Sequence, residues 1–149
     1  MPLDPSYVGR TYPSTPAYQV SREKIREFAD AINDPNPVYR SADAARALGY
    51  NDVIAPPTFA IVVTMQAARQ ILEDPDLGID YSRVVHGEQR FVHTRPVCAG
   101  DLLEVVVAVE SIRVAAGNDI VTSRADVSTP EGELVLTAYS TLVARGTAA

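Results

Sequence analysis

The hydrophobic and polar positions divide the chain into a helical first half and a β-rich second half. Prolines and glycines interrupt residues 1–18 five times, which predicts an extended arm rather than a regular element. Beyond Ser21, a residue type suited to a helix N-cap, apolar residues recur at helical spacing as far as Asn33. A second, short helix is expected from Ser41 through Leu48, where a glycine follows as its stop.

The segment at residues 59–72 carries conflicting signals. Its first residues are rich in β-branched side chains, which favour a strand, but its length and its Pro-Pro-Thr start predict a helix. Thr58 is expected to cap this helix, which should end before Pro75. The first half of the segment is apolar on every side, so other elements must surround it. We therefore expect its core contacts to include Phe59, Val62, Val63 and Leu72.

Four runs of β-type residues follow, at positions 84–93, 102–114, 120–128 and 134–145. Short turn-forming segments separate them, so we expect an antiparallel meander. Such a sheet has one face to bury, and only the helix at 59–72 is long enough to cover it. The sequence thus predicts an α+β protein with the hot-dog fold, in which a curled antiparallel sheet wraps around a central helix. Residues 1–149 are expected to form a single domain, with 1–18 as its arm.

Composition and charge narrow the possible partners. The 149 residues carry a formal net charge of −6, and twelve of the thirteen basic residues are arginines that no stretch concentrates. Neither nucleic acid nor an anionic membrane is therefore expected as a partner. The single cysteine, Cys98, excludes a disulfide framework and a cysteine-based zinc site. No apolar run reaches the roughly 20 residues of a membrane span, and the N-terminus lacks the features of a signal peptide, so we expect a soluble cytoplasmic protein.

Several motifs resemble those of one enzyme family. Residues 34–39 (Asp-Pro-Asn-Pro-Val-Tyr), then Gly49-Tyr50 and residues 54–59 (Ile-Ala-Pro-Pro-Thr-Phe), resemble the MaoC-like (R)-specific enoyl hydratases and 3-hydroxyacyl-thioester dehydratases. That family carries the signature Asp-x-Asn-Pro-(Ile/Val)-His, followed by an Ala-His-Gly-like turn that opens the central helix. Residues 89–91, 95–101 and 139–145 resemble its later strand and turn segments, so the resemblance covers nearly the whole chain.

The resemblance implies a reaction and a set of site residues. The family adds or removes water across the α,β bond of an acyl thioester of CoA or carrier protein, with a carboxylate and an imidazole as acid and base. Backbone N–H groups at the start of the central helix stabilise the enolate-like oxygen. No metal or organic cofactor is implied. Carried over position by position, the catalytic positions are Asp34 and Tyr39, and the substrate-binding positions are Asn36, Pro57, Thr58 and Phe59.

Two of these positions depart from the family pattern. Tyr39 stands where the family has histidine, and a phenol with a pKa of about 10 is a poor base at neutral pH. Pro57 stands at the glycine position of the turn and has no N–H to offer an oxyanion. This pattern resembles the degenerate subunit of two-subunit 3-hydroxyacyl-carrier-protein dehydratases. The resemblance therefore implies a homodimer, or a heterodimer with a related hot-dog subunit that has an intact Asp/His pair.

Other interpretations of the same residues remain open. A hot-dog thioesterase could use Asp34 to activate water, and a non-catalytic acyl-thioester-binding module would need neither acid nor base. Asp34 could be an Asx-type cap, and Tyr39 an ordinary packing residue. His86 and His93 are seven residues apart on one strand, which predicts that they lie on opposite faces and share no ligand.

Overall fold

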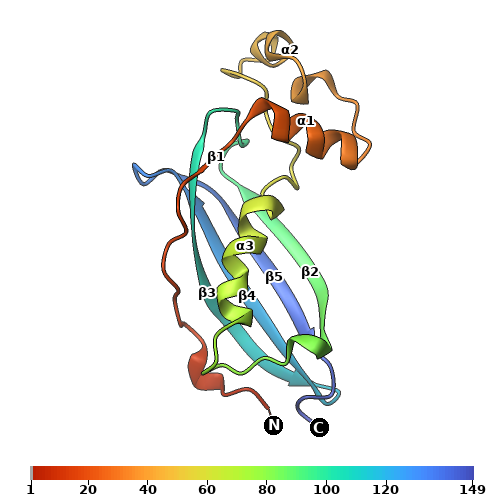
Figure 1. Cartoon of the computed structure of the whole chain (residues 1–149), viewed down its shortest axis with the longest axis vertical. Coiled ribbons are helices and arrows are strands. Elements are labelled where there is room, and N and C mark those ends of the chain that lie inside the picture. The colour runs from red at the N-terminus through yellow and green to blue at the C-terminus, as the bar shows by residue number, and fades with distance from the viewer. Residues whose placement is uncertain (1) are drawn as a thin grey trace.

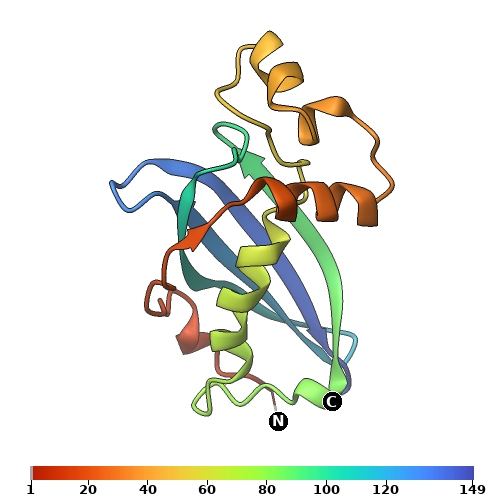
Figure 2. The same cartoon turned by 45° about the horizontal axis from the view of Figure 1, so that its top comes forward.

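The computed structural model describes residues 2–149, which form one sheet, one long central helix and a group of short helices (Figure 1). The helices are α1 (Arg22–Ala31), α2 (Ala42–Ala47) and α3 (Ile61–Leu72), with 3₁₀ turns η1 (Pro5–Tyr7), η2 (Pro37–Tyr39) and η3 (Tyr81–Arg83). The strands are β1 (Tyr18–Gln19), β2 (Val84–His93), β3 (Leu102–Ala115), β4 (Asn118–Ser128) and β5 (Leu134–Ala144). Figures 1 and 2 show the sheet curling around α3, with α1 and α2 beyond one end of the sheet. The predicted hot-dog architecture is confirmed.

The order of the strands differs from a simple meander. The sheet is antiparallel with the order β1-β3-β4-β5-β2, so β2 pairs with β5 and not with β3, the next strand in sequence. Residues 94–101 instead cross the end of the sheet from β2 to β3. Arg95 holds this connection by ion pairs to Asp101 at 2.8 Å and to Glu133 at 3.0 Å. The first long strand therefore becomes an outer edge of the sheet.

Two of the three predicted helix caps are present in the structure. The hydroxyl oxygens of Ser21 and Ser41 accept hydrogen bonds from backbone N–H groups three residues later, both at 3.1 Å, as predicted. Thr58 does not cap α3, because the helix begins only at Ile61 and Ala60 is its N-cap without a side-chain hydrogen bond. Residues 57–60 form a turn instead, in which the Phe59 N–H donates to the Pro56 carbonyl at 2.9 Å.

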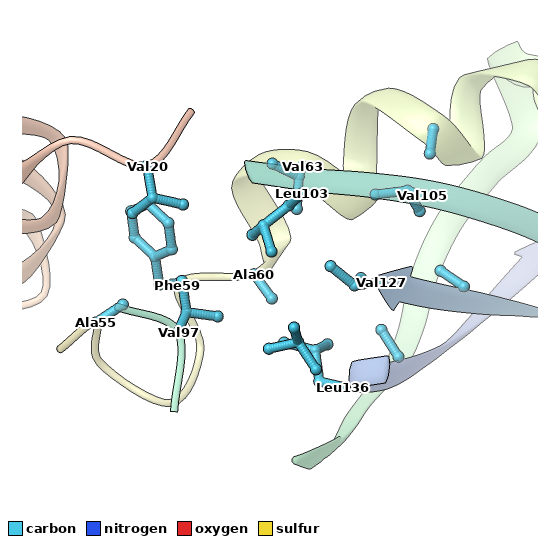
Figure 3. Close-up of a cluster of buried hydrophobic side chains, with 14 of the residues drawn as sticks. Val20, Ala55, Phe59, Ala60, Val63, Val97, Leu103, Val105, Val127 and Leu136 are labelled. Atoms are coloured by element: carbon cyan, nitrogen blue, oxygen red, sulfur yellow. The ribbon is translucent and has the colours of Figure 1, made fainter. Parts of the chain in front are cut away.

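The core lies between α3 and the concave face of the sheet. Phe59 is fully buried and contacts the Phe28 ring of α1 edge-on, with 5.5 Å between ring centroids. Figure 3 shows this ring beside Val20, with Val63 and the inward side chains of β3 and β4 further along the core. Val63 is buried as expected, whereas Val62 and Leu72 are only half-buried. The helix packs on β3 and β4, and it leaves the β5–β2 side of the sheet less covered.

The N-terminal arm contains the 3₁₀ turn η1 and otherwise lies along the free side of β3 (Figure 1). Its N–H groups at Gly9, Tyr12 and Thr15 donate to β3 carbonyls at 2.8–3.0 Å, and β1 continues the same pairing. These bonds satisfy backbone groups that an edge strand would otherwise expose. Among residues 2–149, β2 is therefore the long strand with an uncovered edge.

The arm is also attached to the segment that follows α3. The Tyr12 hydroxyl donates to the Asp74 carboxylate at 2.7 Å, and the Arg10 guanidinium lies 3.3 Å from the same carboxylate. Burial, followed by the bond to Asp74, raises the pKa of Tyr12. The Tyr12 hydrogen bond in turn lowers the pKa of Asp74. No helix within residues 2–149 has the length and apolar character that crossing a membrane requires.

The central position of α3 makes a prediction about stability. Val63→Asp should lower the free energy of unfolding by about 3–5 kcal/mol, because it buries a charge that has no partner. Met65→Asp is the matched control, since Met65 lies on the same helix and is 61% exposed; it should cost about 0.5 kcal/mol or less. Urea denaturation measures both, and equal stability of the two variants would contradict the buried position of Val63.

The Tyr12–Asp74 bond predicts a pH-dependent contribution to stability. It requires ionised Asp74, whose folded pKa is lowered, so its contribution is present above about pH 4 and is lost as the pH falls through the folded pKa. It also requires neutral Tyr12, whose folded pKa is raised, so the contribution is present below about pH 10 and is lost as the pH rises through that pKa.

Tyr12→Phe should therefore melt below the wild type near pH 7, and the difference should shrink in acid and in strong alkali. Tyr7→Phe, in the same arm and beside the same Arg10, is the control. Thermal melts across the pH range provide the measurement. A Tyr12→Phe difference that stays constant from pH 3 to pH 7 would contradict this account.

Candidate functional site

The segment that follows α1 positions the predicted catalytic residues. The Asp34 carboxylate accepts a hydrogen bond from the Asn36 N–H, and the Asn36 side-chain oxygen accepts one from the Val38 N–H, both at 3.1 Å. These two successive Asx-type turns shape the chain into η2. Asp34 and Asn36 therefore both have a structural role, and the half-buried Asp34 carboxylate keeps one oxygen without a hydrogen bond from residues 2–149.

Tyr39 ends η2 and is 8% exposed. Burial, followed by the negative charge of Asp34, raises the pKa of the Tyr39 phenol. The side chain is therefore neutral at physiological pH, and it could donate a hydrogen bond but not accept a proton as a base. The structure thus brings Asp34 and Tyr39 close enough to interact electrostatically.

The turn before α3 holds the other predicted binding residues. Pro57 and Thr58 are exposed, whereas the Phe59 ring is in the core and the Phe59 N–H is already bonded to Pro56. The Thr58 N–H has no hydrogen-bond partner among residues 2–149. Because it lies near the positive end of the α3 dipole, Thr58 is the member of this group best placed to hold a negatively charged oxygen.

A cavity lies elsewhere, between α3 and the β5–β2 side of the sheet. Its volume is about 820 Å³, which is within the range of small-molecule sites. None of the six predicted site residues lines it. It follows α3 from the first turn to the last, and its walls include Ile61, Thr64, Met65, Ala68, His86, Gln89, Ser140 and Leu142.

A small polar cluster interrupts the apolar walls of the cavity. The His86 Nε2 atom lies 3.0 Å from the Ser140 hydroxyl and 3.3 Å from the Gln89 side-chain oxygen. Opposite this cluster, Thr64 on α3 is buried, and its hydroxyl has no partner among the described residues. The amide nitrogen of Gln89 is likewise buried without a partner. Unpaired buried groups are rare and call for an explanation.

The position of His86 differs from the sequence prediction. The pairing of β2 with β5 shifts between His86 and Glu88, so Gly87 forms a bulge and the alternation of faces is reset there. His86 consequently points to the same face as Gln89 and His93, not to the opposite face from His93. A glycine inside a strand pattern was the sequence signal that could have indicated the bulge.

Beyond this bulge, His93 lies 6.2 Å from the Phe91 ring, and burial lowers its pKa. No three histidine, cysteine, aspartate or glutamate side chains within residues 2–149 come together as a metal site would require. The polar cluster in the cavity is therefore built from neutral hydrogen-bonding groups around one histidine.

Comparison with known proteins finds a matching family model and similar proteins over nearly the whole chain. The model of the family described as "FAS1-like, dehydratase domain region" matches residues 6–138. A UPF0336 protein of Saccharopolyspora erythraea is 63% identical over 148 residues, covering 99% of this chain and 95% of the relative. A UPF0336 protein of Streptomyces avermitilis is 60% identical over 145 residues, covering 97% of each chain.

Two solved structures are similar in both sequence and fold. One is a MaoC-like dehydratase with a TM-score of 0.87 and 37% identity, over 93% of this chain and 42% of the other, so this chain spans less than half of that protein. The second is the C-terminally truncated HadBC (3R-hydroxyacyl-ACP dehydratase) complex from Mycobacterium tuberculosis. It has a TM-score of 0.82 and 36% identity, over 92% of this chain and 96% of the other.

Proposed function

Because the chain belongs to the FAS1-like dehydratase-region family of MaoC-like hot-dog proteins, we propose that it is the acyl-binding subunit of a 3-hydroxyacyl-thioester dehydratase or hydratase. A related partner subunit supplies the aspartate–histidine pair that performs the proton transfers. The substrate is an acyl thioester of CoA or carrier protein. The protein acts as a hydro-lyase within this complex and is weak or inactive alone.

The observation that carries this proposal is the cavity beside α3. The helix has 12 residues, which corresponds to a length of about 18 Å, and the cavity follows most of it. Its first wall residue, Ile61, comes three positions after Thr58. A thioester held at the Thr58 turn would therefore extend its acyl chain along α3. The mostly apolar walls suit a hydrocarbon chain.

The chemistry explains why a partner is needed. Dehydration removes a proton from the carbon beside the carbonyl and expels the 3-hydroxyl group as water, so a base and an acid are required. Here Asp34 is already bonded to the Asn36 N–H, and Tyr39 is a neutral phenol. Tyr39 therefore cannot act as the base that the family's histidine provides, and Asp34 alone does not make up the acid–base pair. In the proposed complex these proton transfers take place on the partner's aspartate and histidine, while the Thr58 N–H can stabilise the carbonyl oxygen.

The uncovered edge of β2 is the surface that supports pairing. A ten-residue strand with free backbone groups on one side is a template for another strand. Val85 and Val92 on β2 are both more than two-fifths exposed, which adds apolar area beside that edge. The similar HadBC structure is a complex of hydroxyacyl-ACP dehydratase subunits. We therefore place the related subunit of this chain against β2.

The proposed assembly predicts a dimer. The chain alone should pair with itself at micromolar concentration and should form a heterodimer when co-expressed with a relative that carries an intact Asp-x-Asn-Pro-x-His motif. Substitution of Val92 by Lys should weaken pairing, because it places a charge beside the edge. Val106→Lys, on the opposite part of the sheet and also exposed, is the control. Light scattering that gives a monomer under every condition would contradict the assembly.

The proposed chemistry predicts the activity of the separate chain. Purified alone, it should hydrate a short enoyl-CoA at least about 100-fold more slowly than the mixture with an intact relative, since a missing acid or base costs roughly 10²–10⁴-fold. Tyr39→His, alone and with Pro57→Gly, tests whether restoring the family residues restores turnover. Loss of enoyl absorbance is the measurement.

Three results would contradict this assignment of roles. Robust turnover by the separate wild-type chain that Asp34→Asn abolishes would make this chain catalytic by itself. Release of free thiol from an acyl thioester would indicate a thioesterase. A mixture that forms no complex and shows no activity, while the separate chain still binds acyl thioester, would indicate a non-catalytic binding module.

A further inference from the structure

We propose that the polar cluster in the cavity selects an acyl chain that carries an oxygen atom, as a hydroxyl or carbonyl group, part-way along an otherwise hydrocarbon chain. This inference rests on the proposed function, because it assumes that the cavity holds the acyl chain. It goes further by specifying which class of chain fits. The residues that carry it are Thr64 on α3, Gln89 and His86 on β2, and Ser140 on β5.

The cluster is arranged so that one donor remains free. The Gln89 side-chain oxygen lies 3.3 Å from His86 Nε2, and the same nitrogen lies 3.0 Å from the Ser140 hydroxyl. With His86 Nε2 as the donor, the oxygen end of the Gln89 amide faces His86 and the NH₂ end is available. That nitrogen is buried and has no partner among residues 2–149. An amide NH₂ can only donate, so it requires an acceptor.

A second unpaired group lies on α3. The Thr64 hydroxyl is buried and has no partner in the described part of the chain, and Thr64 itself is only 5% exposed. Both Thr64 and Gln89 line the same cavity, from α3 and from β2 respectively. A ligand oxygen between them could accept from Gln89 and also bond to Thr64, which can either donate or accept. Both a carbonyl and a hydroxyl meet this requirement.

The selectivity follows from the cost of leaving these groups unpaired. In the free protein, both groups are buried without a partner among residues 2–149. A plain hydrocarbon chain would leave them unpaired, whereas an oxygen at the right depth would supply the missing hydrogen bonds. Leaving one buried polar group unpaired weakens binding by roughly tenfold. The cavity should therefore discriminate against a plain chain, while its apolar remainder still holds the rest of the ligand.

The depth of the oxygen can be bounded from the helix. Thr64 lies three residues beyond Ile61, which is about 4.5 Å along the axis, while the cavity continues past it to Leu72 and Glu73. Gln89 and His86 lie deeper, because β2 begins at the end of the cavity where α3 ends and runs back toward the Thr58 turn (Figure 1). The preferred oxygen should therefore lie near the middle of the chain, with hydrocarbon on both sides of it.

The test compares binding of saturated thioesters, which lack the 3-hydroxyl group and the double bond of the reaction. Dodecanoyl-CoA and a series of its oxo derivatives, each with one mid-chain carbonyl at a different position, are titrated into the full chain by calorimetry, and the strongest isomers are then titrated into the complex with its partner. At least one isomer should bind about tenfold more tightly than the plain chain.

Near-isosteric variants separate this role from a structural one. Thr64→Val with Gln89→Met removes both free groups and should abolish the preference, mainly by weakening binding of the oxo isomers. Leu142→Met, in the wall of the same cavity, is the matched control and should keep the preference. If the double variant folds poorly, Gln89→Met alone, which leaves Thr64 intact, tests whether the preference for oxo isomers depends on the Gln89 amide.

The outcomes separate this inference from the proposed function. Equal binding of the plain chain and all oxo isomers by the wild type would overturn the inference and leave the acyl-binding role intact. A preference that persists unchanged in the Thr64→Val, Gln89→Met variant would also overturn it. If the chain and the complex bind no acyl thioester of any kind, the proposed function fails together with the inference.

Discussion

A single helix cannot cover the concave face of this sheet, and the remaining features follow from that constraint. The 12 residues of α3 pack on β3 and β4, where Phe59 and Val63 complete the core. The β5–β2 side keeps a cavity of about 820 Å³. An apolar sheet face left open to water is unfavourable, so a ligand or a partner that fills this space gains free energy. The incomplete coverage of the sheet is thus what makes a binding site available.

The two edges of the sheet differ in whether another segment covers their backbone groups. The N-terminal arm covers β3 by backbone hydrogen bonds, and the Tyr12–Asp74 bond attaches it to the segment that follows α3. The edge of β2 has no such cover among residues 2–149, and it borders the cavity through His86 and Gln89. A partner that pairs with β2 would therefore also approach the ligand. Pairing and substrate binding are expected to be coupled through this one strand.

The candidate site has two parts that the sequence places far apart. The segment that contains Asp34 and Tyr39 carries the family's catalytic positions, but hydrogen bonds to the backbone engage Asp34, and burial keeps Tyr39 neutral. The cavity carries the Thr64 hydroxyl and the Gln89 amide nitrogen, which have no hydrogen-bond partner among residues 2–149. The first segment thus combines the family's catalytic positions with local structural roles, and the cavity carries the unpaired groups. This division is compatible with the supporting subunit that we propose.

The sequence by itself determined the three α-helices and four long strands to within a few residues, the hot-dog architecture and the Ser21 and Ser41 caps, because these depend on local periodicity and on residues close in the chain. The motif at residues 34–39 likewise identified the family. Only the tertiary structure decided that β2 joins β5, that α3 begins at Ile61 rather than at Phe59, and that His86 turns into the cavity. Strand order depends on a connection that crosses the sheet, and one bulge at Gly87 reverses every later face assignment on the strand. Pairing between distant segments sets both, and no local pattern records it.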